Sequence, residues 1–252
     1  MKTITFIGNG NMALSIAKGL KENYKIEVIG RNLEKLNKFE NELGVKITKE
    51  LMDNCSVEGK TVMFCVKPAN VEEVSKKLKG CARVVYSVLA GTTVEKLRTN
   101  LNPMAVVRTM PNLCASVNRS MTTLTGDLEF QEEAHELLGA IGSTRWLSSE
   151  KELDIATALA GSGPAYLALI AEALADGAVK QGLRRDDAMN IMRGLFGGFG
   201  ELIQDVHPAI LKDGVMSPGG TTAAGYGALE DGNVRAACIN AIEKAFKRAK
   251  EL

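Results

Sequence analysis

The chain has few of the residues from which metal centres and disulfide frameworks are built. Its 252 residues include only two histidines, and its five cysteines are an odd number with no pair in CxxC spacing. We therefore expect no metal site, no disulfide scaffold and reduced cysteines, as in a cytoplasmic protein. The formal net charge is only +1, so nothing points to nucleic acid or a membrane surface as a partner.

Long apolar runs, leader segments and repeats are missing as well. We find no segment that is both apolar enough and long enough to span a bilayer. The start of the chain, MKTITFIGNG, enters a strand-like pattern without the layout of a signal peptide. No internal repeat or low-complexity linker interrupts the sequence. The composition, 45% hydrophobic and 24% charged, is that of a globular protein with a sizeable core.

The pattern of residues changes near position 150. Before it, β-rich runs alternate with helical stretches, which predicts a mainly parallel sheet covered by helices. After it, helical patterns follow one another. We predict an α/β N-terminal domain with a Rossmann-type doubly wound sheet over residues 1–149, and an all-α C-terminal dimerisation domain over residues 150–252. The expected strands are Thr3–Ile7, Ile26–Ile29, Val45–Ile47, Thr61–Val66, Arg83–Val88, Ala105–Arg108, Met121–Leu124 and Thr144–Leu147. The expected helices include Val71–Leu78, Glu129–Ile141, Glu150–Gln181, Asp186–Gln204, Gly219–Glu230 and Asn233–Lys250. We expect the glycines and proline of Gly161–Pro164 to interrupt the helix Glu150–Gln181.

A helix over Ile155–Val179 has too few charged residues to leave a broad face in water. A helix that is apolar on all sides is buried on all sides, and a small helical domain can hardly bury one alone. We therefore predict a homodimer through the C-terminal helices. Burial within a single chain, against Ala105–Gly142, is the alternative that the sequence leaves open.

A glycine motif follows the first expected strand and opens a helix. Its residues are Gly8, Asn9, Gly10, Asn11, Met12 and Ala13. The first glycine allows a tight turn, the second lets a pyrophosphate approach the backbone, and the small Ala13 permits close packing of helix on strand. The start of the helix then offers free N–H groups to the phosphates. This context predicts dinucleotide binding, with a merely structural turn as the alternative.

The end of the second strand indicates which dinucleotide is bound. An NAD site usually has an acid there to hold the ribose 2′-hydroxyl, but here the chain continues with Arg31 and Asn32. The planar guanidinium of Arg31 can meet a 2′-phosphate with charge and paired hydrogen bonds. NADPH is therefore the predicted cofactor and NADH the second option, unless Arg31 is simply a solvated loop residue.

Three more strand ends are expected to line the cofactor, because ligands of open parallel sheets lie beyond the carboxyl ends of the strands. Any one of these segments alone could be only a turn. The residues are Val66, Lys67 and Pro68; Ala90 and Gly91; and Met110, Pro111 and Asn112.

A second glycine motif, SPGGTT at Ser217–Thr222, precedes a C-terminal helix. We expect Ser217 to be the N-cap and Pro218 the first helical residue. Gly219, Gly220 and Thr221 would then present free N–H groups to a small anion, most simply a carboxylate. A flexible hinge between two helices is the alternative.

These motifs together resemble the pyrroline-5-carboxylate reductase family over the whole chain. The resemblance rests on Gly8–Ala13, Val66–Pro68, Arg108–Asn112, Ala160–Tyr166 and above all Val215–Thr222 continuing into Ala228–Glu230. It implies reduction of 1-pyrroline-5-carboxylate to L-proline, the last step of proline biosynthesis, by hydride transfer from NAD(P)H to the imine carbon. The expected partner is a second copy of the chain, as a homodimer or a higher oligomer of dimers through the C-terminal helices.

The resemblance further assigns roles to the second motif. The backbone of Gly219, Gly220 and Thr221 and the hydroxyl of Ser217 would hold the substrate carboxylate. Thr222 would contact the imine nitrogen. In the related hydroxyacid dehydrogenases a catalytic lysine lies one turn after a glycine motif on the long helix, whereas this chain has Leu167 there. An imine needs no base to remove a hydroxyl proton, which fits that absence.

Two other functions stay open from the sequence alone. The chain could be a hydroxyacid dehydrogenase or a different imine reductase, or it could be an NADP-binding regulatory protein without activity. Turnover of NADPH with different substrates separates these alternatives.

Overall fold

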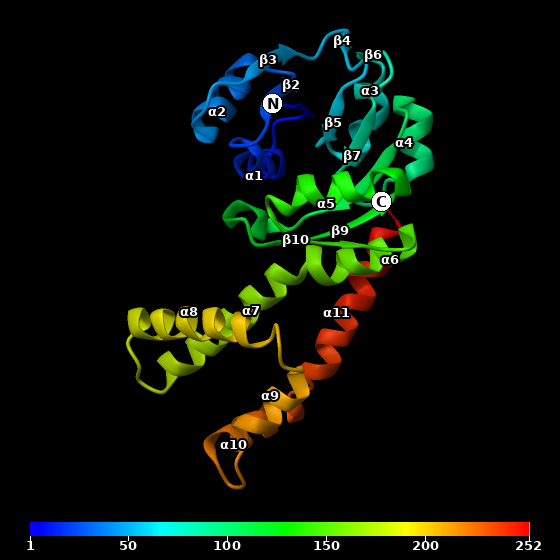
Figure 1. Cartoon of the computed structure of the whole chain (residues 1–252). Coiled ribbons are helices and arrows are strands. Elements are labelled where there is room, and N and C mark those ends of the chain that lie inside the picture. The colour runs from blue at the N-terminus through cyan, green and yellow to red at the C-terminus, as the bar shows by residue number, and fades with distance from the viewer. Residues whose placement is uncertain (252) are drawn as a thin grey trace. The chain divides into compact units, whose positions relative to one another are not determined.

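In the computed structural model, which describes residues 1–251, eight strands of the N-terminal part form one sheet (Figure 1). Their order is β10-β9-β8-β7-β5-β1-β2-β3, and neighbours are parallel except β8 and β9. The order reverses direction between β1 and β5, as expected for a Rossmann-type sheet. The strands are β1 (Thr3–Ile7), β2 (Lys25–Gly30), β3 (Thr48–Leu51), β5 (Thr61–Phe64), β7 (Val84–Ser87), β8 (Val106–Met110), β9 (Ser120–Gly126) and β10 (Gly142–Trp146).

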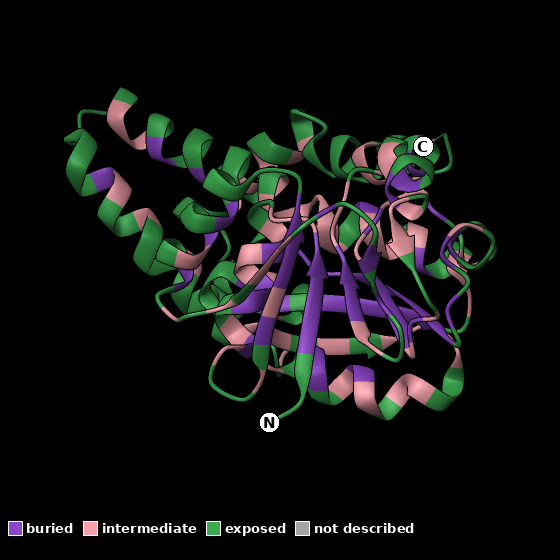
Figure 2. Cartoon of the chain, turned by 90° about the horizontal axis from the view of Figure 1, so that it is seen from above, coloured by how far each residue is buried: buried purple, intermediate pink, exposed green. Residues whose placement is uncertain are grey.

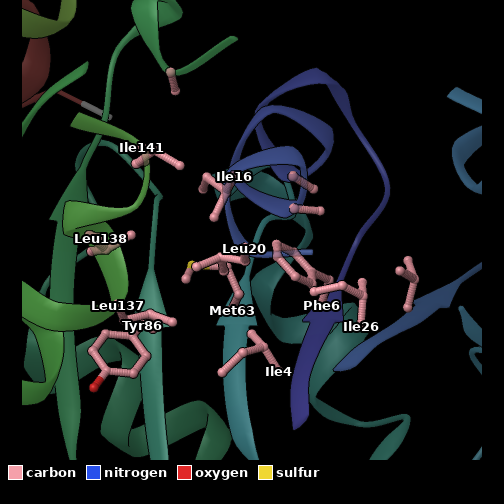
Figure 3. Packing of buried hydrophobic residues seen from close by; sticks show 14 of the residues in the cluster. Ile4, Phe6, Ile16, Leu20, Ile26, Met63, Tyr86, Leu137, Leu138 and Ile141 are labelled. Carbon is pink, nitrogen blue, oxygen red and sulfur yellow. The ribbon is translucent and has the colours of Figure 1, made fainter. Parts of the chain in front are cut away.

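Helices cover both faces of this sheet. Helices α1 (Asn11–Leu20), α2 (Leu33–Leu43) and α5 (Gln131–Gly139) contribute to one hydrophobic cluster, and α3 (Val71–Ser75) and α4 (Val94–Leu101) contribute to the other. Figure 3 shows Ile16 and Leu20 of α1 among Phe6, Met63 and Leu138 of the first cluster. Each such fully buried side chain stabilises the fold by about 1.5–3 kcal/mol.

The strands are mostly buried, and Figure 2 draws them largely in purple. Two differences from the predicted strands occur near the edge of the sheet. The strand expected at Val45–Ile47 is wrong, since β3 begins at Thr48. A separate pair of short strands, β4 (Cys55–Ser56) and β6 (Leu78–Lys79), was not predicted. The 3₁₀ turns are η1 (Pro68–Asn70), η2 (Leu113–Val117) and η3 (Leu128–Phe130).

The C-terminal part is helical, as predicted. Helix α6 (Glu150–Ala156) continues through a π turn, η4 (Thr157–Gly161), into α7 (Gly163–Lys180). The remaining helices are α8 (Arg185–Leu202), α9 (Pro208–Val215), α10 (Thr221–Asp231) and α11 (Val234–Ala249). Helix α9 was not predicted.

Contacts divide the chain into two compact units. The first unit is Met1–Pro164 together with the segment from Lys244 onward, and the second unit is Ala165–Glu243. Helix α6 belongs to the first unit because Arg108 of β8 pairs with it: its guanidinium lies 2.9 Å from both Glu150 and Asp154. The division expected at residues 149 and 150 stays a prediction.

Candidate active site

The turn after β1 has the geometry that its glycines suggest. Gly8 has φ of +104°, and a Cβ there would lie 2.6 Å from the carbonyl oxygen of Cys65, so only glycine fits. Gly10 is the N-cap of α1, with nothing within 4 Å of where its Cβ would be. The backbone at the start of α1 is therefore unobstructed beside Gly10, while Ala13 is fully buried. This is the arrangement of a phosphate-binding helix start.

The start of α2 lies after the neighbouring strand. The side chain of Asn32 accepts a hydrogen bond from Lys35 N at 3.0 Å, so it caps this helix. Arg31 is exposed beside it. Arg31 is therefore accessible to a ligand, and Asn32 is engaged in the protein through its side-chain oxygen.

The other predicted strand ends lie at the same edge. Because β1, β2, β5, β7 and β8 are mutually parallel neighbours, their carboxyl ends share one edge of the sheet. That edge carries Val66, Lys67 and Pro68 after β5, Ala90 and Gly91 after β7, and Met110, Pro111 and Asn112 at the end of β8. The structure thus brings all the predicted cofactor residues to one edge. Burial raises the pKa of the Cys65 thiol at this edge, so Cys65 stays protonated.

Within the Arg108–Asn112 motif, the side chain of Arg108 contacts helix α6 and is not proposed to line the cofactor. Its side chain is 1% exposed and pairs with Glu150 and Asp154 of α6. Glu150 also accepts a hydrogen bond from Val94 N at 2.9 Å, at the start of α4. Arg108 is therefore an internal anchor of α6. The sequence marked it as part of a strand end but gave no sign of its two partners.

Asn112 is buried, and its side chain bonds within the protein. Its Nδ2 donates to the carbonyl oxygen of Ala160 at 2.9 Å, and its Oδ1 accepts from Cys114 N at 3.0 Å. The bond to Ala160 joins the end of β8 to the π turn of the long helix. Neither the bond nor the π turn was predicted from the sequence.

The second glycine motif is a turn followed by a helix. Gly220 N donates to Ser217 O at 3.0 Å, and Gly219 has φ of +70°. Pro and Gly at the two central positions are typical of a type II turn. The N-cap of α10 is Gly220, so the predicted N-cap Ser217 and first helical residue Pro218 are wrong. The turn chemistry of Pro-Gly outweighs the capping preference of Ser-Pro at this position.

This turn changes which N–H groups α10 can offer. The N–H of Gly220 is used inside the turn, whereas Thr221 and Thr222 occupy the first two helical positions, whose N–H groups have no acceptor within a helix. A Cβ on Gly220 would lie 2.5 Å from Ser217 Oγ, so this glycine lets the serine hydroxyl lie close to the helix start. Ser217 and Thr221–Thr222 are thus brought together, in the second unit.

Helix α10 is tied to α11 by a polar cluster. Arg235 Nε donates to Glu230 Oε1 at 3.1 Å, and the hydroxyl of Tyr226 donates to the same carboxylate. The hydrogen bond from Arg235, followed by that from Tyr226, holds the pKa of Glu230 below its usual range. The negatively charged carboxylate of Glu230 therefore links α10 to α11.

Two family models match the chain. "Pyrroline-5-carboxylate reductase dimerisation" matches residues 150–252, and "NADP oxidoreductase coenzyme F420-dependent" matches residues 3–91. A pyrroline-5-carboxylate reductase of Pisum sativum is 36% identical over 264 residues, covering 99% of this chain and 96% of the relative. The chain belongs to the pyrroline-5-carboxylate reductase family.

Solved structures of this family agree. The enzyme from Streptococcus pyogenes aligns with a TM-score of 0.87 at 32% identity, covering 99% of this chain and 98% of that one. A Plasmodium falciparum pyrroline carboxylate reductase with NADP bound shares the fold, with a TM-score of 0.82 at 24% identity, covering 99% of this chain and 97% of that one. The predicted activity, pyrroline-5-carboxylate reduction in proline biosynthesis, is confirmed, and so are the NADP(H)-binding α/β fold and the helical dimerisation domain.

A dimerisation domain of this family explains the apolar surface of the C-terminal helices. Leu167 and Leu169 of α7 are 54% and 66% exposed in the single chain. The other helices of the second unit do not cover these side chains. They are available to a second copy of the family's dimerisation domain.

The same helix corrects one expectation. Among the described residues, the helical run Glu150–Lys180 has 31 residues and contains an 18-residue window with a mean hydropathy of 1.4, enough to cross a membrane by length and composition alone. The prediction that no segment is so long and apolar is wrong. The π turn carries α6 into α7, so the glycines do not divide the helix as the sequence suggested.

Proposed function

We propose that the chain holds NADPH along the carboxyl edge of its sheet and holds pyrroline-5-carboxylate at the start of α10. The cofactor assignment depends on one observation: five parallel strands end at one edge and carry the open N-cap Gly10 and the exposed Arg31. Phosphates would bind at the start of α1, and the 2′-phosphate would bind Arg31. NADH, which lacks that phosphate, is the weaker cofactor in this proposal.

The substrate carboxylate is proposed to bind at the Ser217–Gly220 turn. The hydroxyl of Ser217 and the N–H groups of Gly219 and Thr221 are the donors. Gly220 has no Cβ and therefore leaves room for the Ser217 hydroxyl. The N–H of Gly220 is not among the donors, because it already donates to Ser217 O. The partial positive charge at the start of α10 favours an anion here.

Thr222 is proposed to orient the imine nitrogen. When bound, NADPH supplies a hydride to the imine carbon. The hydroxyl of Thr222 is too weak an acid to protonate the nitrogen by itself. The substrate therefore enters as the iminium or is protonated through water, and Thr222 fixes the direction of the nitrogen by a hydrogen bond.

The remaining parts of the proposal concern assembly and place. The chain acts as a homodimer, or as a higher oligomer of dimers, through its C-terminal helices. It works in the cytoplasm, without a nucleic-acid or membrane partner. The exposed leucines of α7 support the homodimer.

An NADPH oxidation assay tests the proposed function. We expect the chain to consume NADPH with pyrroline-5-carboxylate, to do so more slowly with NADH at equal concentration, and to leave a hydroxyacid unreacted with NADP⁺. Equal or better use of NADH would contradict the role of Arg31. Tight NADPH binding without turnover would favour a regulatory protein.

A Thr222→Ala variant tests the orienting role. Loss of a hydrogen bond to a charged nitrogen costs about 1.5–3 kcal/mol, so kcat/KM for pyrroline-5-carboxylate should fall roughly 10- to 100-fold. Thr99→Ala is the control, because the exposed Thr99 hydroxyl donates within its own helix, to Glu95 O at 3.0 Å. A Thr222→Ala enzyme with near-parental kcat and KM would show that this hydroxyl does not hold the nitrogen.

A further inference from the structure

The long helix of the first unit is widened where it reaches the Ala160–Pro164 motif. Ser162 N donates to Thr157 O at 3.1 Å, a bond that spans five residues in place of four. The residue four positions after Ala160 is Pro164, whose nitrogen has no hydrogen to donate. The carbonyl of Ala160 therefore lacks its usual α-helical donor.

Asn112 supplies a donor to this carbonyl. Its Nδ2 lies 2.9 Å from Ala160 O, across 48 residues of sequence. The other polar groups of Asn112 fix it in place, because Oδ1 accepts from Cys114 N at 3.0 Å and the backbone N–H donates to Ser120 Oγ at 3.1 Å. The side chain is only 8% exposed. Asn112 is thus rigid, and the Ala160 carbonyl bonds to a fixed group.

This bond lies at the carboxyl edge of the sheet, where the cofactor is proposed to bind. Met110, two residues before Asn112, ends β8. A Cβ on Gly161, the residue after Ala160, would lie 4.0 Å from Met110 Cγ. The bond between Asn112 and Ala160 therefore holds Met110 and Gly161 next to each other.

We propose that Asn112 is a positioning residue for hydride transfer: its amide takes the place of the N–H that Pro164 lacks and fixes the π turn Thr157–Gly161 against the end of β8. The inference rests on the proposed function, because it takes this edge as the nicotinamide end of the cofactor site. Asn112 acts through Met110 and Gly161 and does not itself hold the cofactor, since its side chain is engaged on both sides.

A positioning role for Asn112 affects the rate of hydride transfer and leaves the affinity for NADPH unchanged. The proposed anchors of NADPH are Gly10 and Arg31, which follow β1 and β2, so loss of the Asn112 bond should leave the affinity for NADPH intact. The nicotinamide would be held less well aligned, and misplacement by about 1 Å can cost roughly 100-fold in rate. A residue that merely supported the fold would not separate these two quantities.

Two variants remove the donor and keep an acceptor for Cys114 N. Asn112→Asp is nearly the same shape but cannot donate to Ala160 O, and Asn112→Ser is uncharged and too short to reach it. Measured on the full chain, we expect the single-turnover rate of NADPH oxidation with pyrroline-5-carboxylate to fall about tenfold or more in both variants. The Kd of NADPH, from cofactor fluorescence, should stay within about twofold of the parent.

Asn102→Asp is the matched control, since it makes the same chemical change at an exposed residue, the C-cap of α4. Its single-turnover rate should equal that of the parent. If the Asp variant does not fold, as judged by circular dichroism, the Ser variant decides the question.

Three results would overturn the inference. A folded variant with the parental single-turnover rate would show that the bond does not position the cofactor. A loss of NADPH affinity as large as the loss of rate would make Asn112 a cofactor-holding residue. A parent chain that oxidises no NADPH with pyrroline-5-carboxylate would overturn the proposed residue roles and this inference together, whereas an active parent with unaffected variants overturns this inference alone.

Discussion

At the residue scale, Arg31 is the proposed discriminator between NADPH and NADH. If Arg31 binds the 2′-phosphate as proposed, alanine at this position removes a hydrogen bond to a charged group, which contributes about 1.5–3 kcal/mol. We predict that Arg31→Ala raises the KM for NADPH roughly 10- to 100-fold and changes the KM for NADH by less than about twofold. Initial rates with each cofactor, at saturating pyrroline-5-carboxylate, measure both values.

Lys38→Ala is the control for this change. Lys38 is an exposed cation of α2, the helix that follows Arg31, and pairs with Glu42 at 3.6 Å. Its removal lowers the positive charge by the same amount at a distance from the strand end. If both variants weaken NADPH binding equally, the effect is one of general charge and Arg31 has no specific role.

Gly219 and Gly220 illustrate how far single residues predict the structure of the second glycine motif. Their role in leaving the helix start open to a small anion stays a prediction, whereas the expected start of the helix at Ser217 and Pro218 lies one helical turn before the observed N-cap, Gly220. The pair Pro218-Gly219 is a type II turn signal that could have placed the turn from the sequence. The bond of Asn112 to Ala160 had no such signal, because it joins segments 48 residues apart.

At the scale of elements, strands were predictable where side chains are buried. The first strand, Thr3–Ile7, was predicted with its observed bounds because four of its five residues are buried and apolar or β-branched. Strand β3 was misplaced because it is an edge strand of sequence TKEL with no buried residue. Its position is set by pairing with β2, where Glu27 faces Thr48. The position of such a strand along the chain is determined by pairing with its neighbour more than by its own residues.

Helix α5 depends on an ionisable group for its attachment to the sheet. Glu133 of α5 accepts hydrogen bonds from Arg83 at 2.5 Å and Tyr86 at 2.9 Å. Burial alone would raise the pKa of Glu133, but the hydrogen bonds from Arg83 and Tyr86 and the charge of Arg83 outweigh it, so the pKa is lowered. Unfolding therefore takes up a proton on Glu133 in acid.

This predicts a defined dependence of stability on pH. A carboxyl with a lowered folded pKa contributes stability above its unfolded pKa of about 4.3, and the contribution is lost as pH falls through the folded value. In Glu133→Gln that contribution is absent at every pH. Between pH 5 and pH 3 its Tm should therefore fall less than that of the parent, by roughly 2 °C or more.

Glu132→Gln is the control for this prediction, because Glu132 is the exposed neighbour of Glu133 on the same helix. Thermal melts followed by circular dichroism across the pH range compare the three proteins. Parallel Tm curves for the parent and Glu133→Gln would mean that the carboxylate is not stabilised in the folded state.

At the scale of the whole molecule, the helical unit is incomplete as a single chain. Helix α8 has an exposed apolar stripe at positions spaced by four, four and three residues, which place it on one helix face. It consists of Ile191, Leu195, Phe199 and Leu202, between 46% and 62% exposed. A monomer rarely leaves such a stripe in water. The sequence predicted a dimer from the low charge of α7, and α8 adds a second surface of the same kind.

We predict that Leu195→Glu disrupts the dimer. A glutamate in the middle of the stripe would be buried without a partner in the interface, at a cost of several kcal/mol. Size-exclusion chromatography with light scattering should show the parent at about twice the chain mass of 27.0 kDa, or at a multiple of that dimer mass, and the variant shifted toward one chain mass at micromolar concentration. Arg193→Glu is the control, because Arg193 is exposed on the opposite side of α8. A variant that keeps the parental mass would place the stripe outside the interface, and the apolar surface of α7 would then have to carry the association.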